Sequence, residues 1–109
     1  MYARNPLQVI NQTDSYGNPT GGSVDGMGLH VSWQDGPLGR LPATPNGAFL
    51  EDLIEAVRQR LVFYQEAASG KFACRENALA ITKLEEAAMW LQARRAAREA
   101  RGVQGTHQP

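Results

Sequence analysis

The sequence predicts an α+β protein in which a small N-terminal antiparallel sheet packs on an antiparallel two-helix hairpin, assembled as a homo-oligomer. Short segments of alternating polarity occur in the first half of the chain. Apolar residues at helical spacing form two runs in the second half, and the short link between them is typical of a hairpin. At 109 residues the chain fits one domain, 1–109, whose limited core favours packing between copies.

Residues 6–43 are expected to form short strands and loops. Residues 29–34 (LHVSWQ) alternate strictly between apolar and polar side chains, which is the pattern of a half-buried strand. Residues 6–12 predict a second strand. Between them, residues 13–28 are rich in Gly, Ser, Asn and Asp, which predicts a mobile loop. Because a two-stranded ribbon is marginal alone, the sheet should pack on a helix.

Residues 46–101 are expected to form the helical hairpin. Asn46 is the predicted N-cap of the first helix, which should end near Ala68 because serine and glycine follow. The second helix should cover residues 75–101 and stop at the next glycine. Its apolar residues cover more surface than the first helix can bury, which favours another copy as a further partner. Residues 102–109 are expected to form a flexible tail.

The charge balance limits the possible partners. The chain has 11 basic and 11 acidic residues, and a net charge of zero disfavours a nucleic-acid polymer as partner. The basic set contains nine arginines and two lysines, a bias that suits bidentate recognition of anions. No apolar stretch approaches the roughly 20 residues of a membrane span, and the N-terminus lacks a signal peptide's apolar core. We therefore expect a cytosolic protein with no membrane partner.

Signatures of catalysis and of metal binding are absent from the sequence. It contains no GxGxxG, Walker, HExxH or GxSxG motif. The one cysteine, Cys74, excludes an intrachain disulfide and a cysteine-based zinc cluster. His30, on the predicted strand, is interpreted as a structural histidine rather than a ligand or a base. The sequence therefore predicts a binding protein, with no catalytic residue, no metal and no cofactor.

The predicted second helix has different chemistry at its two ends. Arg75 and Asn77 lie in its first turn, where backbone amides attract phosphate and an amide side chain can pair with the edge of a base. Arg94, Arg98 and Arg101 occur near its end at i, i+4 and i+7, on one side of the helix. They indicate either a solvated helix end or a bound anion. The distribution favours a binder of small, anionic, planar molecules.

Further candidate contacts are aromatic residues near the connector and one loop arginine. Phe72 lies in the connector beside Arg75, and it is interpreted equally as a plug of the hairpin or as a platform on which a base stacks. Phe63 and Tyr64, near the end of the first helix, are alternative platforms. Arg40, in the loop before the first helix, is a candidate phosphate clamp.

Asn77 and Arg94 cannot hold the same small ligand within one chain. They are 17 residues apart, which is ~25 Å along a helix, and they point roughly 100° apart around it. Two copies packed antiparallel would bring the start of one helix close to the end of the other. A pocket shared between subunits is therefore the predicted arrangement.

Two parts of the chain resemble a known group of phage anti-defence proteins. The run CRENALAITKLEEAAMWLQAR, followed by ARGVQGTH, resembles the hairpin shared by the sponges that counter CBASS and those that counter Thoeris. The segments HVSWQDGPLG and NGAFLEDLIEAVRQRLVFYQ resemble the Thoeris anti-defence (Tad) branch, which has a small sheet before the hairpin. The resemblance covers roughly residues 27–107, and residues 1–26 match less clearly.

The resemblance implies a non-enzymatic sponge that sequesters the cyclic nucleotide signals of bacterial immune enzymes in the cytoplasm of the infected host. For the Tad branch these are glycocyclic ADP-ribose isomers bound between protomers, and several members also bind cyclic di- or trinucleotides at separate sites of a hexamer. The expected homo-oligomer is a dimer or a hexamer. By position, Arg75 and Asn77 match the start of the hairpin helix, and Arg94 matches the arginine near its end. Phe72 is the first choice for the base platform, and Arg40 is the one basic residue of its loop.

Two other classes of function stay open on the residues alone. A structural or adaptor protein would dock its hairpin on a partner helix and leave its arginines as a solvated rim. Substituting Arg94 by alanine separates this class from a sponge, because a sponge would lose ligand binding while still assembling. A DNA-binding protein is disfavoured by the charge balance, and it would show steeply salt-dependent retention on duplex DNA.

Overall fold

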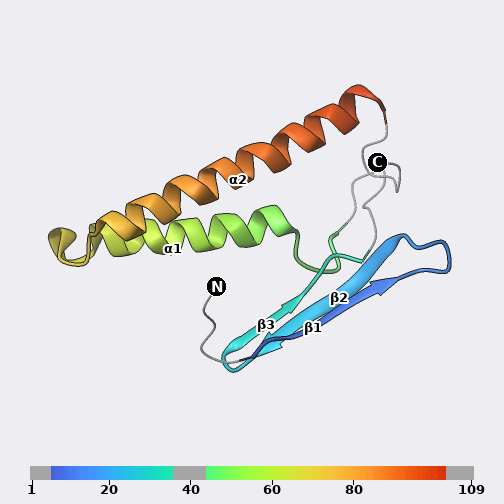
Figure 1. Cartoon of the computed structure of the whole chain (residues 1–109), viewed down its shortest axis with the longest axis horizontal. Helices are drawn as coiled ribbons and strands as arrows, with labels where there is room; N and C mark the ends of the chain where they lie inside the picture. The colour runs from blue at the N-terminus through green and yellow to red at the C-terminus, as the bar shows by residue number, and fades with distance from the viewer. Residues whose placement is uncertain (1–5, 36–43, 103–109) are drawn as a thin grey trace. The chain divides into compact units, whose positions relative to one another are not determined.

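The computed structural model describes residues 6–35 and 44–102, which belong to two compact units (Figure 1). One unit contains the sheet and the segment that follows it, and the other contains the two helices, residues 50–100. The elements confirm the predicted α+β class, with a small antiparallel sheet before a pair of helices. The packing of the sheet on the hairpin and the assembly into a homo-oligomer stay predictions.

The sheet has three antiparallel strands in the order β1-β2-β3, and these are β1 (Gln8–Thr13), β2 (Pro19–Gly26) and β3 (Leu29–Ser32). The prediction of a loop over residues 13–28 was wrong, because β2 occupies much of that segment. Glycines weaken a strand in isolation, but Gly22 lies where the backbones approach closely. A Cβ there would collide with the backbone carbonyl of Ile10 on β1. Pairing on both sides thus makes the glycine-rich segment the central strand.

Asn46 does not cap the first helix, which begins at Leu50. Its Oδ1 accepts a hydrogen bond from the backbone N–H of Asp35 at 2.7 Å, and its Nδ2 donates to the Asp35 carbonyl at 3.3 Å. A backbone bridge between Trp33 and Ala48 continues the same connection. The predicted N-cap was wrong because the Asn46 amide ties the entering segment to the chain that leaves β3.

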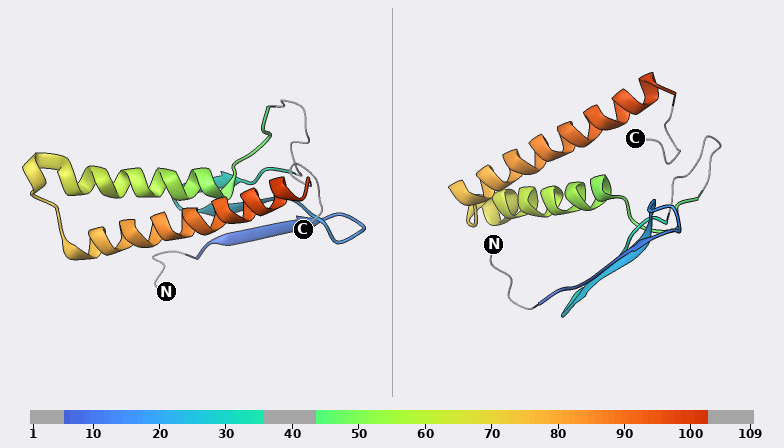
Figure 2. Two further views of the ribbon diagram at one scale, coloured as in Figure 1. Left: turned by 90° about the horizontal axis from the view of Figure 1, so that it is seen from above. Right: turned by 45° about the vertical axis from the view of Figure 1, so that its right-hand side comes forward.

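The helical unit is an antiparallel hairpin of α1 (Leu50–Gly70) and α2 (Arg75–Ala100), in which the two helices run side by side (Figure 2). Helical geometry in α1 ends before Ala67, whose ψ is 146°, and Ala68, Ser69 and Gly70 have φ values of 51°, 57° and 88°. α2 contains no such interruption. Its predicted end is confirmed by Gly102, whose φ is 71°.

No side chain of the hairpin, residues 50–100, is buried. One stripe of α2 is half-buried, and it comprises Ala80, Ile81, Leu84, Ala87, Ala88 and Leu91. Met89 and Trp90 are 66% and 77% exposed. The hairpin therefore buries these α2 residues only in part and leaves Met89 and Trp90 largely exposed. A single hairpin leaves large apolar side chains in water, which favours a further partner.

Candidate ligand-binding site

The start of α2 is built around Cys74, the residue before the helix. Its carbonyl accepts from the N–H of Ala78 at 3.2 Å, the first bond of the helix. Its Sγ accepts from the N–H of Asn77 at 3.4 Å, so Cys74 acts as the N-cap. Arg75 is exposed and Asn77 is half-buried. These two predicted site residues therefore both lie in the first turn of α2, as their spacing indicated.

The connector brings Phe72 close to that first turn. The Asn77 Nδ2 donates to the Phe72 carbonyl at 3.5 Å. The Phe72 ring is 55% exposed, and the Lys71 Nζ lies 5.5 Å from its centre. The Asn77 side chain and the Phe72 backbone are thus in contact at the turn end of the hairpin.

An apolar hollow of about 460 Å³ lies at this turn end, lined by Phe63, Tyr64, Ala67 and Phe72. It brings together the three rings that the sequence left as alternative base platforms. The Phe63 and Tyr64 rings have their centres 6.1 Å apart and are tilted by 52°. Phe63 is 53% exposed and Tyr64 is 40% exposed, so these rings are accessible to a flat ligand.

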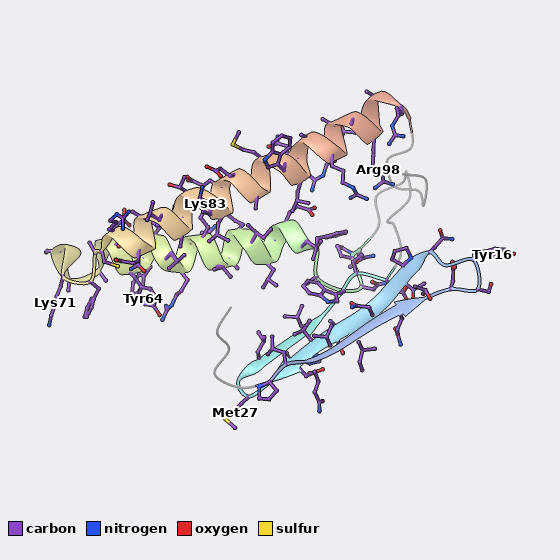
Figure 3. The ribbon with its side chains drawn as sticks, in the orientation of Figure 1. Tyr16, Met27, Tyr64, Lys71, Lys83 and Arg98 are labelled. Carbon is purple, nitrogen blue, oxygen red and sulfur yellow. The ribbon has the colours of Figure 1, made fainter. Side chains whose placement is uncertain are left out.

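Two cations border the aromatic hollow. The Arg60 guanidinium carbon lies 5.1 Å from the centre of the Phe63 ring and 5.0 Å from that of Tyr64. Lys71, on the connector, is the second cation, and Figure 3 shows Lys71 and Tyr64 at the same end of the hairpin. Cations over aromatic faces provide both stacking surface and positive charge. The turn end can therefore accept a planar ring and a nearby anionic group.

The far end of α2 contains the predicted arginines Arg94 and Arg98. Arg94 is exposed and Arg98 is half-buried. Between them, the Arg95 Nη2 lies 2.8 Å from the Glu51 Oε2 at the start of α1. This ion pair joins the end of α2 to the start of α1. Arg95 is not one of the predicted site residues.

The two ends of α2 do not meet within one chain. Figure 3 shows Lys71 at the turn end of the hairpin and Arg98 at the opposite end. Because α2 is one uninterrupted helix, Asn77 and Arg94 keep the ~25 Å separation that their spacing predicts. The structure therefore places Arg75, Asn77 and Phe72 together but leaves Arg94 and Arg98 remote. Arg40 lies outside the described residues.

The sheet contains a second polar group, which the sequence did not reveal. The His30 Nδ1 contacts the Asp25 Oδ1, and the His30 Nε2 lies 3.2 Å from the Ser32 Oγ. The hydrogen bond from His30 lowers the pKa of the Asp25 carboxyl below its ordinary value. This order of groups is that of a hydrolase relay. However, the His30 side chain is 66% exposed and that of Asp25 is 43% exposed, so water competes for every bond.

Three residues near the hollow were missed in the sequence: Arg60, Gln65 and Lys71. Gln65 makes two hydrogen bonds to the backbone of Cys74. Arg60 precedes Tyr64 by four positions, a helical spacing that could have indicated their contact. No local pattern marks Gln65, because its partner lies across the turn.

The described residues, 6–35 and 44–102, contain no group of three metal-ligating side chains and no helix of the length and hydropathy that membrane crossing needs.

The fold and the candidate site define a small helical-hairpin protein that carries an N-terminal sheet. The model of the family "Acb2/Tad1, hairpin domain" matches residues 29–96, more than half of the chain, and the chain belongs to this family. The chain is also similar to a protein named Thoeris anti-defense 1, from Bacillus phage SBSphiJ7, with 54% identity over 78 residues. The match covers 72% of this chain and 51% of the phage protein, so the chain spans about half the length of that relative.

Proposed function

We propose that the chain is a phage anti-defence sponge that binds glycocyclic ADP-ribose-type signalling nucleotides and sequesters them without cleavage. It acts as a homo-oligomer in the cytoplasm of the infected bacterial host. Cyclic di- and trinucleotides are further ligands, at separate sites. Membership of the Acb2/Tad1 hairpin family and the similarity to a protein named Thoeris anti-defense 1 support this role.

The observation that supports the proposal most is the arrangement of polar groups along α2. Asn77 is at the start of an uninterrupted 26-residue helix, and Arg94 is almost five turns later, at about 3.6 residues per turn. Neither end alone surrounds a dinucleotide-sized ligand. Two antiparallel copies would supply a base-pairing amide and a phosphate-binding guanidinium to the same pocket. The absence of buried side chains in the hairpin supports such an assembly.

The turn end supplies groups that a cyclic ADP-ribose-type ligand needs. One of the rings around the hollow stacks on the adenine, with Phe72 as the first choice because its carbonyl is bonded to Asn77. Arg60, over the Phe63 and Tyr64 rings, and Arg75, in the first turn of α2, provide positive charge for the pyrophosphate. Binding neutralises the phosphates and encloses the adenine. It requires no catalytic nucleophile and no general base, so the ligand is released unchanged.

Titration calorimetry with a glycocyclic ADP-ribose isomer tests the proposal. A sponge lowers free ligand stoichiometrically, so the expected Kd is on the order of nanomolar. After heat denaturation of the complex, chromatography should recover the intact ligand. A degraded product would contradict the sponge, and its loss in His30→Ala would assign the cleavage to the relay on the sheet. An absence of binding to any cyclic nucleotide would also contradict it.

A second candidate is an adaptor that docks its hairpin on a partner helix. The exposure of Met89 and Trp90 on α2 favours this class. Arg94→Ala separates the two. A sponge with this substitution loses nucleotide binding while its assembled mass is unchanged, whereas an adaptor binds its partner as before.

A further inference from the structure

We propose that Gln65 is a positioning residue for the ligand site at the turn end of the hairpin, an inference that rests on the proposed function. Gln65 lies on α1 next to Tyr64, one of the residues that line the hollow. Its role is to fix the start of α2 against the end of α1. The aromatic groups of α1 and the polar first turn of α2 then keep one geometry before a ligand arrives.

The side-chain amide of Gln65 makes two hydrogen bonds to one residue across the turn. Its Oε1 accepts from the Cys74 N–H at 2.9 Å, and its Nε2 donates to the Cys74 carbonyl at 3.1 Å. A primary amide can satisfy a backbone donor and a backbone acceptor at once, as a neighbouring strand would. Gln65 itself is half-buried, whereas Cys74 is exposed.

The residue held in this way is the one that starts α2. Cys74 also accepts hydrogen bonds from the backbone of Asn77 and Ala78, at its Sγ and its carbonyl. Fixing Cys74 therefore fixes the direction of the first turn, in which Asn77 lies. Because the Asn77 Nδ2 in turn donates to the Phe72 carbonyl, the same contacts set the place of the Phe72 backbone.

The connector would not keep this geometry by its own preferences. Ala68 and Ser69 are in the left-handed region, with φ values of 51° and 57°, which costs non-glycine residues free energy. Two backbone bonds, Lys71 N–H to Ala68 and Ala73 N–H to Gly70, hold the turn locally. They do not connect the turn to the helices. Gln65 provides that connection, so its loss would let Phe72 and Asn77 move relative to Tyr64.

Replacing Gln65 by methionine removes both hydrogen bonds at similar volume, and Gln59→Met is the matched control. Gln59 lies on the same helix, and its Nε2 donates to the Glu55 carboxylate at 3.0 Å. In calorimetry with a glycocyclic ADP-ribose isomer, well below the unfolding midpoint, Gln65→Met should weaken affinity about tenfold or more. Gln59→Met should bind as the unsubstituted chain does. A residue that only stabilises the fold would lower the unfolding midpoint and leave the Kd unchanged.

Gln65→Glu provides a rescue that depends on the carboxyl proton. The ionised carboxylate can accept from the Cys74 N–H but cannot donate to its carbonyl, whereas the protonated acid can do both. Relative to the unsubstituted chain at each pH, its affinity should be about tenfold weaker at pH 7 and should recover toward pH 4.5. Gln65→Met should show no recovery.

The outcomes separate this inference from the proposed function. If the unsubstituted chain binds and Gln65→Met binds equally well, the positioning role is wrong and the sponge stands. Equal losses in the two methionine variants would also overturn the positioning role. If the unsubstituted chain binds no cyclic nucleotide, the proposed function fails, and the positioning role fails with it.

Discussion

The Glu55 carboxylate has two hydrogen-bonded neighbours on its own helix. The Arg58 Nε and Nη2 lie 2.7 Å from the two carboxylate oxygens, and the Gln59 Nε2 lies 3.0 Å from one of them. These bonds, led by those from Arg58, lower the pKa of Glu55 from 4.5 to about 2. The Arg58 Nη1 also lies 3.7 Å from the Glu85 Oε2 on α2, so Arg58 connects the two helices.

The lowered pKa predicts that stability falls in acid. A group whose pKa is depressed in the folded state stabilises that state above the unfolded pKa, and loses this effect as pH falls through the folded pKa. The unfolding midpoint should therefore drop between about pH 4.5 and pH 2, and Glu55→Gln should flatten this part of the profile. Urea denaturation at a series of pH values and a fixed protein concentration measures this midpoint. Glu66→Gln, an exposed residue of the same helix, is the control. An unchanged slope in Glu55→Gln would contradict the assignment.

Sequence reasoning placed the site residues that depend on helical spacing and missed those that depend on the turn. The positions of Arg75 and Asn77 in the first turn of α2 followed from the pattern of the helix. Arg60 and Gln65 were missed, because their contacts require the path of the connector. The roles of all these residues in binding stay predictions.

At the scale of elements, local composition predicted the helices better than the sheet. The apolar periodicity and the glycine after α2 set its limits, since both act within a few residues. β2 was missed because its hydrogen bonds come from two neighbouring strands, and its glycines resemble those of a loop. The end of α1 was also only partly predictable, since helical geometry stops before Ala67 and the last three residues of the assigned range are left-handed.

The left-handed turn after α1 predicts a stabilising substitution. Ala68→Gly should raise the free energy of unfolding by about 1 kcal/mol, because glycine adopts a φ of 51° without the strain that alanine has. The same change at Ala56, in the exposed middle of α1, should lower it by about 1 kcal/mol. Denaturant unfolding of the full chain at one concentration gives both values. A loss at Ala68 as large as that at Ala56 would contradict the conformation of the turn.

At the scale of the whole molecule, the proposed site requires a second chain. α2 has 26 residues and no interruption, so the groups at its two ends cannot converge by bending. In a two-fold dimer each pocket takes the start of one α2 and the end of the other, and the two pockets are equivalent. This arrangement can be tested without a structure of the complex, because it predicts how defective chains complement each other.

Asn77→Ala and Arg94→Ala should each abolish tight nucleotide binding, and a mixture of the two should recover part of it. In a mixed dimer, one pocket receives both substitutions and the other receives neither. Random assembly makes about half of the dimers mixed, so co-refolded chains should regain about a quarter of the unsubstituted binding capacity, with unchanged affinity at those sites. Each variant refolded alone is the control, and light scattering confirms that both assemble. If both groups instead served one chain's own pocket, every site in the mixture would remain defective, and the absence of recovered capacity would exclude a site shared between chains.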